Sequence, residues 1–589
     1  MAMYAEGYDV VPDVLGRGGG PGAFFNDIDV ENEMEYLAAT DVVPDVVKTF
    51  VTYFYSHIRD RNVFEIMNAY DTAWNNLSER YFKISSWPSA ETVAGLVDND
   101  AVFLLLYKEM YYRHIYSKLE PTLEQRCESW DNYCALFNIF LQGNVNMQLP
   151  LQWLWDMIDE FGYQFQSFSQ YRAKLKNKTE DELALLAECG GVWNVLSVLN
   201  YLKAMVDNSD VVNKFRDPTA YGADLTPAEL AEALNDGWDP CNQATHSNVL
   251  PALGYFAQVG LARVHSLLGD YHTAMAKVEA LDLSHPKGQL YTIIPECHVN
   301  VFYYVGFAQL MCRRHKDAMR TFNSILLYVS RTKTFLQRLG QTRFDGILKK
   351  NEQMYALLGL TIPLCPVVRT LDDGVAKQLR EKHGDKLSRM QMGVAEADAV
   401  YEELYAFGCP KFVTTSVPPE ALETLNNYNT QAYSRQLQCF MAEVRQQDGL
   451  QLVRSFLKLY TTISLEQLSS ILAGSPEGRA EAAKLAEGSG QGGGEMSVER
   501  LMQKLMCMKH KTTNKTWSGE GGCLAGTWET ANDVNFRVEG QVVHVADTKT
   551  LRRYGEYFTQ NIQRMATLSR DVKRINMSFP TAADGPGDA

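Results

Sequence analysis

Cysteine and histidine pairs in the middle of the chain are the first residues with metal-binding chemistry. Cys312 and His315 are three residues apart, and Cys297 directly precedes His298. A zinc site needs four convergent ligands, which usually come in two closely spaced pairs. Cys312 and His315 also occupy core-facing positions of a helical repeat described below. The sequence therefore favours packing over metal binding here, and it implies no cofactor.

An aromatic cluster could stack on nucleotide bases, including the cap of a messenger RNA. The cluster comprises Trp153, Trp155, Phe161, Phe165, Phe168 and Tyr171. Phe161, Phe165 and Phe168 follow the i, i+4, i+7 spacing of a single helix face. This spacing favours a buried face over a stacking platform.

Sequence motifs of catalysis do not occur. The glycine-rich runs at 16–22 and 488–494 lack the lysine of a Gly-x-x-x-x-Gly-Lys phosphate loop. The chain also contains no His-Glu-x-x-His motif and no Gly-x-Ser-x-Gly nucleophile elbow. We therefore expect a protein that is not an enzyme.

A basic stretch near the C-terminus is the main candidate for RNA contact. It consists of Arg500, Lys504, Lys509, Lys511 and Lys515. Further positive charge follows at Arg552, Arg553, Arg564, Arg570, Lys573 and Arg574. Positive side chains bind phosphates with an affinity that falls steeply with salt, but the net charge of −15 argues against RNA binding over the whole surface. The sequence favours protein contact or plain solvation for this stretch and leaves RNA contact open.

The elements that position the basic stretch form a predicted winged-helix module at 450–547. Three amphipathic helices come first; Ser464 caps the second, with Gln467 three residues on, and Ser497 opens the third. A β-hairpin follows, in which Gly540 provides the turn. The apolar residues that alternate along it are Val534, Phe536, Val538, Val543 and Val545. A wing of this kind presents a strand edge, and we expect it to bind a partner.

One long helix is predicted after the hairpin, at 549–575. Its apolar residues follow each other in steps of three and four, which is close to a heptad seam. They are Leu551, Tyr554, Phe558, Ile562, Met565, Leu568, Val572 and Ile575. So narrow a seam favours packing against a partner helix on another chain. The alternative is that the helix packs against the rest of its own chain.

The body before the module reads as a helical solenoid. Six positions from Ala262 to Leu281 recur forty-four residues later, from Gly306 to Ile325. Small residues twelve apart in each unit let two antiparallel helices approach closely. Before residue 530, no alternation of apolar and polar residues is long enough to compete with the helical pattern. We predict an all-α fold, a right-handed tetratricopeptide-like solenoid followed by the winged helix and the long helix.

The cysteine count, the N-terminal sequence and the lack of long apolar runs fit a protein that works in the cytoplasm. The 589 residues include eleven cysteines, an odd count with irregular spacing, which fits reduced thiols. The N-terminus lacks the basic and apolar regions of a signal peptide. No run of about eighteen apolar residues occurs, so we expect no membrane span.

The order of these elements resembles that of PCI-domain subunits, scaffold proteins of the proteasome lid, the COP9 signalosome and eukaryotic translation initiation factor three. The amino-acid sequence is most similar to the subunits of initiation factor three. The stretches that carry the resemblance are 99–103 (NDAVF), 108–116 (KEMYYRHIY), 163–171 (YQFQSFSQY), 263–271 (RVHSLLGDY), 454–462 (RSFLKLYTT) and 544–549 (HVADTK). They span nearly the whole chain.

The resemblance implies a non-catalytic scaffold role in translation initiation. Its implied partners are other PCI and MPN subunits, notably subunits E and K, the small ribosomal subunit, and messenger or ribosomal RNA. A scaffold of the proteasome-lid or signalosome type and a stand-alone RNA-binding protein are the alternatives. The expected division is a flexible tail at 1–40, a repeat body at 41–330, a PCI domain at 331–547 with a Gly-rich insertion at 474–495, a bundle helix at 548–577 and a tail at 578–589.

Overall fold

A computed structural model describes most of the chain and divides it into two compact units. The described residues are 43–142, 146–174, 178–221, 225–241, 246–279, 281–365, 371–392, 397–414, 428–447, 449–475, 497–518, 522–530, 534–546 and 549–578. The predicted tail at 1–40, nearly all of the tail at 578–589 and nearly all of the insertion at 474–495 lie outside these residues. The first unit is 1–138 with 147–150, and the second is 139–146 with 151–589.

The first unit is a small helical body with an aromatic core. Its elements are α2 (Asp45–Asp60), α3 (Val63–Met67), the π-helix η1 (Asn68–Ala73), α4 (Trp74–Tyr81), α5 (Ala90–Val93), η2 (Ala94–Leu96), α6 (Ala101–Lys118) and most of α7 (Leu123–Leu141). The rings of Trp74 and Trp87 stack 3.8 Å apart, and Phe50 packs against both. Asp100 caps α6 by accepting hydrogen bonds from two backbone amides of its first turn.

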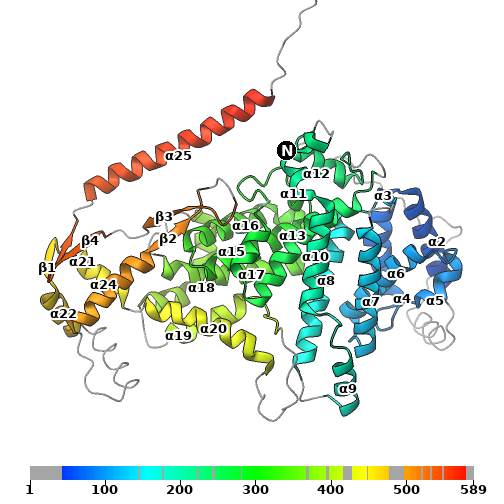
Figure 1. Cartoon of the computed structure of the whole chain (residues 1–589), viewed down its shortest axis with the longest axis horizontal. Helices are drawn as coiled ribbons and strands as arrows, with labels where there is room; N and C mark the ends of the chain where they lie inside the picture. The colour runs from blue at the N-terminus through cyan, green and yellow to red at the C-terminus, as the bar shows by residue number, and fades with distance from the viewer. Residues whose placement is uncertain are drawn as a thin grey trace, which may run out of the picture. The chain divides into compact units, whose positions relative to one another are not determined.

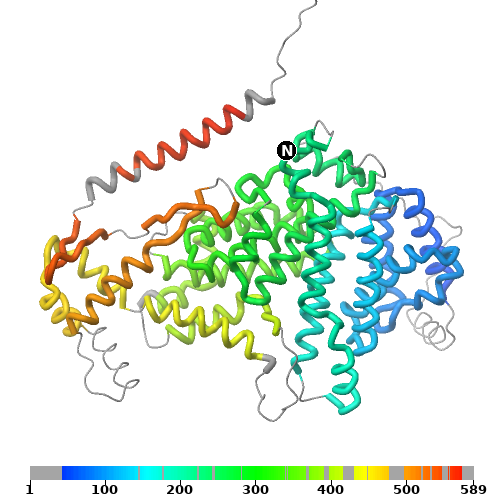
Figure 2. Tube along the Cα trace, viewed as in Figure 1, coloured from blue at the N-terminus to red at the C-terminus, as the bar shows by residue number. Residues whose placement is uncertain are grey.

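The second unit begins with the long helical body drawn in cyan, green and yellow in Figures 1 and 2. Its helices are α8 (Leu151–Ala173), α9 (Glu180–Glu188), α10 (Val195–Ser209), α11 (Val211–Arg216), η3 (Pro218–Tyr221), α12 (Pro227–Asn235), α13 (Val249–Leu268), α14 (Tyr271–Lys277), η4 (Leu290–Thr292), α15 (Pro295–Met311), α16 (His315–Leu336), η5 (Gln337–Leu339), α17 (Gln341–Leu364), α18 (Asp373–Met392), α19 (Ala397–Gly408) and α20 (Tyr428–Gln446). From α13 to α20 each helix packs against the next one in the chain, as the solenoid prediction requires, and α13 also packs against α8 and α10.

The predicted repeat corresponds to the pairs α13–α14 and α15–α16. A β-carbon at Gly306 of α15 would lie 2.5 Å from the ring of Phe322 of α16, so only glycine fits at this crossing. Ala274, Ala318 and Ile325, which the repeat assigns to the core, are all buried. The close helix approach expected from the small residues is therefore confirmed at Gly306. The predicted boundary at 330/331 falls inside α16, which packs against α15 before it and α17 after it.

The winged-helix module follows the body, with the predicted order of elements. It contains α21 (Leu450–Leu457), β1 (Thr462–Ser464), α22 (Leu465–Gly474), α24 (Val498–Thr512), β4 (Phe536–Glu539) and β5 (Val542–Val545). Ser464 and Ser497 each accept a hydrogen bond of 3.2 Å from the amide three residues on, so both predicted caps are confirmed. Gly540 has the positive φ of 58° that its turn requires. The antiparallel sheet has the order β1-β5-β4.

A second, two-stranded antiparallel sheet was not predicted. It pairs β2 (Thr513–Thr516) with β3 (Thr527–Thr530) between α24 and the wing. The expectation that no strand precedes residue 530 is therefore wrong, for these strands and for β1. Strands β2 and β3 are rich in threonine but have no alternation of apolar residues, the signal from which strands were predicted.

The chain ends, within the described residues, in α25 (Lys549–Ser578). This confirms the predicted long helix and extends it by three residues. Throughout the part of the chain that the structure describes, every helix is too short or too polar to cross a bilayer.

Candidate partner-binding surfaces of the C-terminal module

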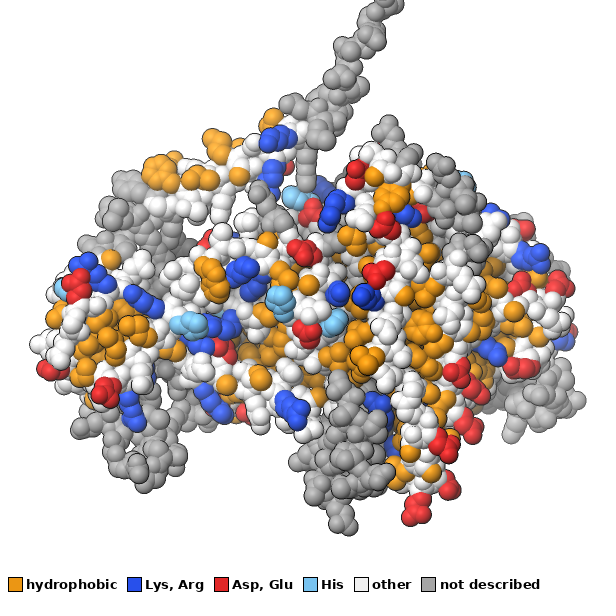
Figure 3. All heavy atoms as spheres, viewed as in Figure 1, with side chains coloured by type: hydrophobic (Ala, Val, Ile, Leu, Met, Phe, Trp, Pro, Cys, Tyr) orange, Lys and Arg blue, Asp and Glu red, His pale blue; other side chains and the backbone are white. Residues whose placement is uncertain are grey.

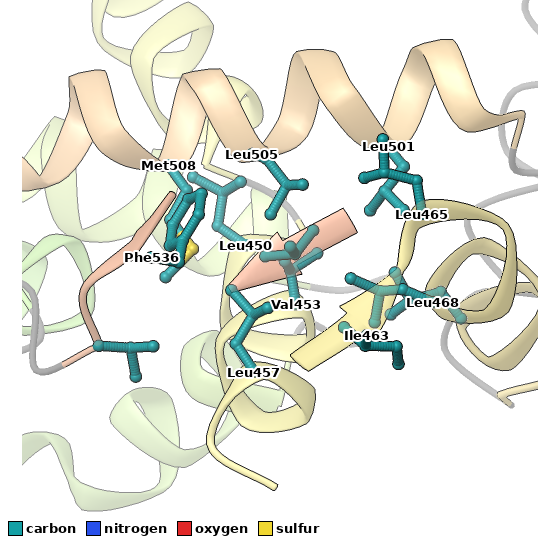
Figure 4. Packing of buried hydrophobic residues seen from close by; sticks show 13 residues of the cluster. Leu450, Val453, Leu457, Ile463, Leu465, Leu468, Leu501, Leu505, Met508 and Phe536 are labelled. Atoms are coloured by element: carbon teal, nitrogen blue, oxygen red, sulfur yellow. The ribbon is translucent and has the colours of Figure 1, made fainter. Parts of the chain in front are cut away.

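The wing side chains pack inside the module. Val534, Phe536 and Val543 are buried in a core shared with the three helices, and Val538 and Val545 pack partly buried against it. Figure 4 shows Phe536 beside Met508 of α24, and Ile463 of β1 near Leu468 of α22. The prediction that these five side chains bind a partner therefore needs correction, because the alternating face of the hairpin closes the module's own core.

What the wing offers a partner is the outer backbone edge of β4. This strand is at the end of the order β1-β5-β4, and among the described residues no further strand pairs with it. Arg537 and Glu539 on its outward face form an ion pair of 3.2 Å and are both largely exposed. The edge is thus a short template for strand addition.

The apolar seam of α25 is exposed over its described length. Phe558, Ile562, Met565, Leu568 and Val572 are each between 54% and 68% exposed. The side chains of Leu551, Tyr554 and Ile575, which complete the predicted seam, lie outside the described side chains. Exposed rows of large apolar side chains are typical of interaction surfaces, which keeps this seam a candidate partner-binding surface.

The basic stretch of α24 and β2 is largely used within the chain. Lys511 is buried, and its ammonium pairs with Glu443 of α20. Lys515 donates a hydrogen bond of 2.8 Å to the carbonyl of Leu524, and the ammonium of Lys509 lies 5.1 Å from the centre of the Phe536 ring. Arg500 is exposed and Lys504 is half-buried, both on α24. Lys511 is therefore not available to phosphates at the surface.

His510 and Arg313 extend the contact between α24 and the body. The guanidinium of Arg313 lies 3.0 Å from Nε2 of His510 and donates a hydrogen bond of 3.2 Å to the His510 carbonyl. Arg313 also pairs with Glu443 at 3.3 Å. His315 is buried beside these charges, and burial lowers its pKa to about 4. The C-terminal end of α24 is consequently an internal joint of the second unit.

A buried ion pair that sequence reasoning missed anchors the β2–β3 ribbon. Nε of Arg314 lies 2.8 Å from Asp317, and the same guanidinium donates hydrogen bonds to the carbonyls of Cys523 and Ala525. Asp317 accepts a hydrogen bond from the amide of Trp517. Burial raises the pKa of Asp317, against the opposing effect of Arg314.

The other candidate sites are packing positions. Trp153, Trp155, Phe161, Phe165 and Phe168 are all buried, which confirms the interpretation as a helix core. His315 is buried at the start of α16, with Cys312 at the end of α15. Across the described residues, no three His, Cys, Asp or Glu side chains converge as metal ligands would.

Comparisons with known proteins find relatives over most of the chain. The family model described as RNA polymerase I-associated factor PAF67 matches residues 125–565. The chain is 40% identical over 580 residues to eukaryotic translation initiation factor 3 subunit L of Danio rerio, covering 94% of this chain and 92% of the relative. The same identity holds for the subunit L proteins of Nematostella vectensis over 535 residues (90% of this chain and 94% of the relative) and Homo sapiens over 575 residues (93% and 94%).

These names describe subunits of an initiation factor rather than enzymes. The identity extends over more than nine-tenths of the relatives' length, well beyond what a shared helical architecture requires. On this ground the chain belongs to the family of eukaryotic translation initiation factor 3 subunit L.

Proposed function

We propose that this chain is a non-catalytic scaffold subunit of translation initiation factor 3 that works in the cytoplasm. It holds neighbouring subunits through its C-terminal PCI domain and bundle helix. The proposed neighbours are other PCI- and MPN-type subunits, notably subunits E and K. Through this complex the chain supports recruitment of the small ribosomal subunit and messenger RNA. The names of its relatives support membership of the complex.

The observation that carries the proposal is the exposed seam of α25. Its described apolar residues are separated by steps of four, three, three and four, and all of them are exposed. Such a stripe suits one or two partner helices in a bundle. Burying each side chain would contribute about 1.5–3 kcal/mol, from which the entropy lost on association is subtracted. The open edge of β4 supports a second contact by strand addition.

Co-purification of a seam variant tests the proposal. Phe558→Asp combined with Ile562→Asp places two charges in the seam, and we expect this variant to separate from the other initiation-factor subunits. A matched control is Thr559→Asp with Gln563→Asp, which puts the same two charges on exposed positions of another face of α25. The control should remain in the complex. If the seam variant still co-purifies with the other subunits, the seam does not hold the chain in the complex.

Direct RNA contact through α24 is the weaker proposal. Its support is limited to the exposed Arg500, since Lys504 is half-buried and Lys509, Lys511 and Lys515 have contacts within the chain. Binding of the full chain to RNA over a series of salt concentrations tests it. An affinity that is weak and nearly independent of salt contradicts phosphate contact.

A further inference from the structure

We propose that the β2–β3 ribbon is a separate docking surface, at which β3 accepts an extended acidic segment of a neighbouring subunit as an added strand, with Trp528 as its apolar anchor. This inference rests on the proposed function, because it requires the chain to be assembled with other subunits. It concerns a different sheet from the wing. The partner is defined by its chemistry: an extended backbone, an apolar residue for Trp528 and acidic neighbours.

The two faces of the ribbon have different environments. Asn514 and Thr516 of β2 are buried, and β2 packs against α16 and α24. All four residues of β3 are exposed. Trp528 is 72% exposed and stands opposite Lys515 in the register of the two strands. The ribbon thus rests on the body through β2 and presents β3 outward.

The ribbon is fixed in place rather than loosely attached. Arg314 binds the carbonyls of Cys523 and Ala525, just before β3, while Asp317 and Arg320 bind the amide and the carbonyl of Trp517, just after β2. Gly526 has a φ of 138°, and a β-carbon there would lie 2.4 Å from the carbonyl oxygen of Thr516. The strand is therefore held in its extended form before any partner arrives, which lowers the entropy lost on binding.

The outer edge of β3 has the features of a strand-binding site. Within the described residues, no hydrogen bond outside its ladder with β2 reaches the backbone of Thr527–Thr530. The strand has no proline and no lysine, the residues that commonly protect an edge from pairing. An exposed tryptophan at its centre supplies the type of side chain that dominates binding energy at interfaces.

Charge selects an acidic partner. Of the described acidic side chains beside the ribbon, Asp317 pairs with Arg314 and Glu529 with Lys316 at 3.1 Å, while Glu279 lies against Gly522. Lys515 donates a hydrogen bond to a backbone carbonyl, which does not neutralise its charge, and Arg320 lies 3.9 Å from Asp317, a carboxylate that Arg314 already pairs at 2.8 Å. Figure 3 shows separate lysine and arginine side chains among uncharged and apolar ones on the face where Figure 1 labels β2 and β3. On a chain of net charge −15, such a local excess of positive charge favours an acidic segment.

Amide hydrogen exchange in the full chain, alone and in the assembled initiation factor, tests the inference. We expect exchange in the peptide 522–530 to slow by about tenfold or more on assembly, because an added strand hydrogen-bonds the edge amides. Trp528→Ala should remove most of this protection while the chain stays in the complex. Trp528→Phe should keep it. Trp238→Ala, which removes another exposed tryptophan, is the matched control and should leave it unchanged.

Three results would overturn the inference. The first is a chain that enters the complex while 522–530 exchanges as fast as in isolation; the proposed function would then stand and the docking surface would not. The second is protection that appears only when single-stranded RNA is added, which would indicate base stacking on Trp528. The third is protection of the isolated chain that grows with its own concentration, which would indicate pairing with a second copy.

Discussion

Lys511 on the last turn of α24 pairs with Glu443 of α20, and this ion pair joins the winged-helix module to the helical body. The ammonium that the sequence made a candidate for phosphate contact is therefore buried at an internal joint. Arg313 reaches the same carboxylate from the end of α15. The joint brings together three segments that are far apart in the sequence.

Replacing Lys511 with methionine should lower the free energy of unfolding by about 1–2 kcal/mol, because Glu443 loses its nearest cation but keeps Arg313. The midpoint of urea-induced unfolding of the full chain measures this. The same variant should bind RNA as the unmodified chain does at every salt concentration. Arg500→Gln, at an exposed position of α24, is the matched surface variant, which should unfold normally. A Lys511 variant that binds RNA more weakly but unfolds normally would contradict the assignment.

Stability should fall as the pH falls from 7 to 5, because buried His315 is held neutral beside Arg313 and Lys511, with Glu443 opposing them. Its pKa is lowered from 6.5 to about 4, so its contribution is fully present above pH 6.5 and is lost below that value as the unfolded chain takes up a proton. The expected loss is about 2 kcal/mol between pH 7 and pH 5 for this group. Thermal unfolding over a pH series measures it.

His315→Leu should reduce this pH dependence, because neither ring nitrogen has a hydrogen-bond partner among the described residues and a leucine fills a similar volume. A part of the slope should remain, since burial also lowers the pKa of His298 to about 4. The exposed His272 is the control position, at which leucine should change the slope little. An unchanged slope in the His315 variant would rule out this source of acid sensitivity.

Arg314→Met should loosen the β2–β3 ribbon, because it leaves the Asp317 carboxylate buried without its closest cation and frees two carbonyls of the loop before β3. Breaking a buried pair on one side costs about 3 kcal/mol, which should appear as faster cleavage by trypsin after Lys515. Arg331→Met is the matched control, since Arg331 is an exposed arginine of the same helix with no contact to the ribbon among the described residues. Equal cleavage rates in both variants would show that Arg314 does not hold the ribbon.

The sequence predicted the elements whose signals are local. Ser464 and Ser497 cap helices because a side-chain oxygen reaches an amide three residues away, and Gly540 turns the wing because glycine tolerates a positive φ. The seam of α25 was visible from spacing alone. Each of these features depends on residues only a few positions apart, so a short stretch of sequence is enough to predict it.

The β2–β3 ribbon and the joint at Lys511 could not be predicted in this way. The ribbon is held by Arg314 and Asp317, about two hundred residues earlier in the chain, and its own strands are polar. Lys511 looks like a solvated residue on a basic helix until Glu443, sixty-eight residues away, is placed beside it. Tertiary contacts decide both features, and no local pattern encodes them.

The repeat makes one further prediction, at the crossing of α15 and α16. Gly306→Ala should lower the free energy of unfolding by about 1–3 kcal/mol, because the added methyl group would lie 2.5 Å from the Phe322 ring in a tightly packed core. Gly346→Ala in α17 is the matched control: no atom lies within 4 Å of its added β-carbon, and alanine in a helix interior should stabilise by about 0.5–1 kcal/mol. Urea unfolding of the two variants should therefore shift in opposite directions. A shift in the same direction would mean that α15 and α16 can separate enough to admit a methyl group.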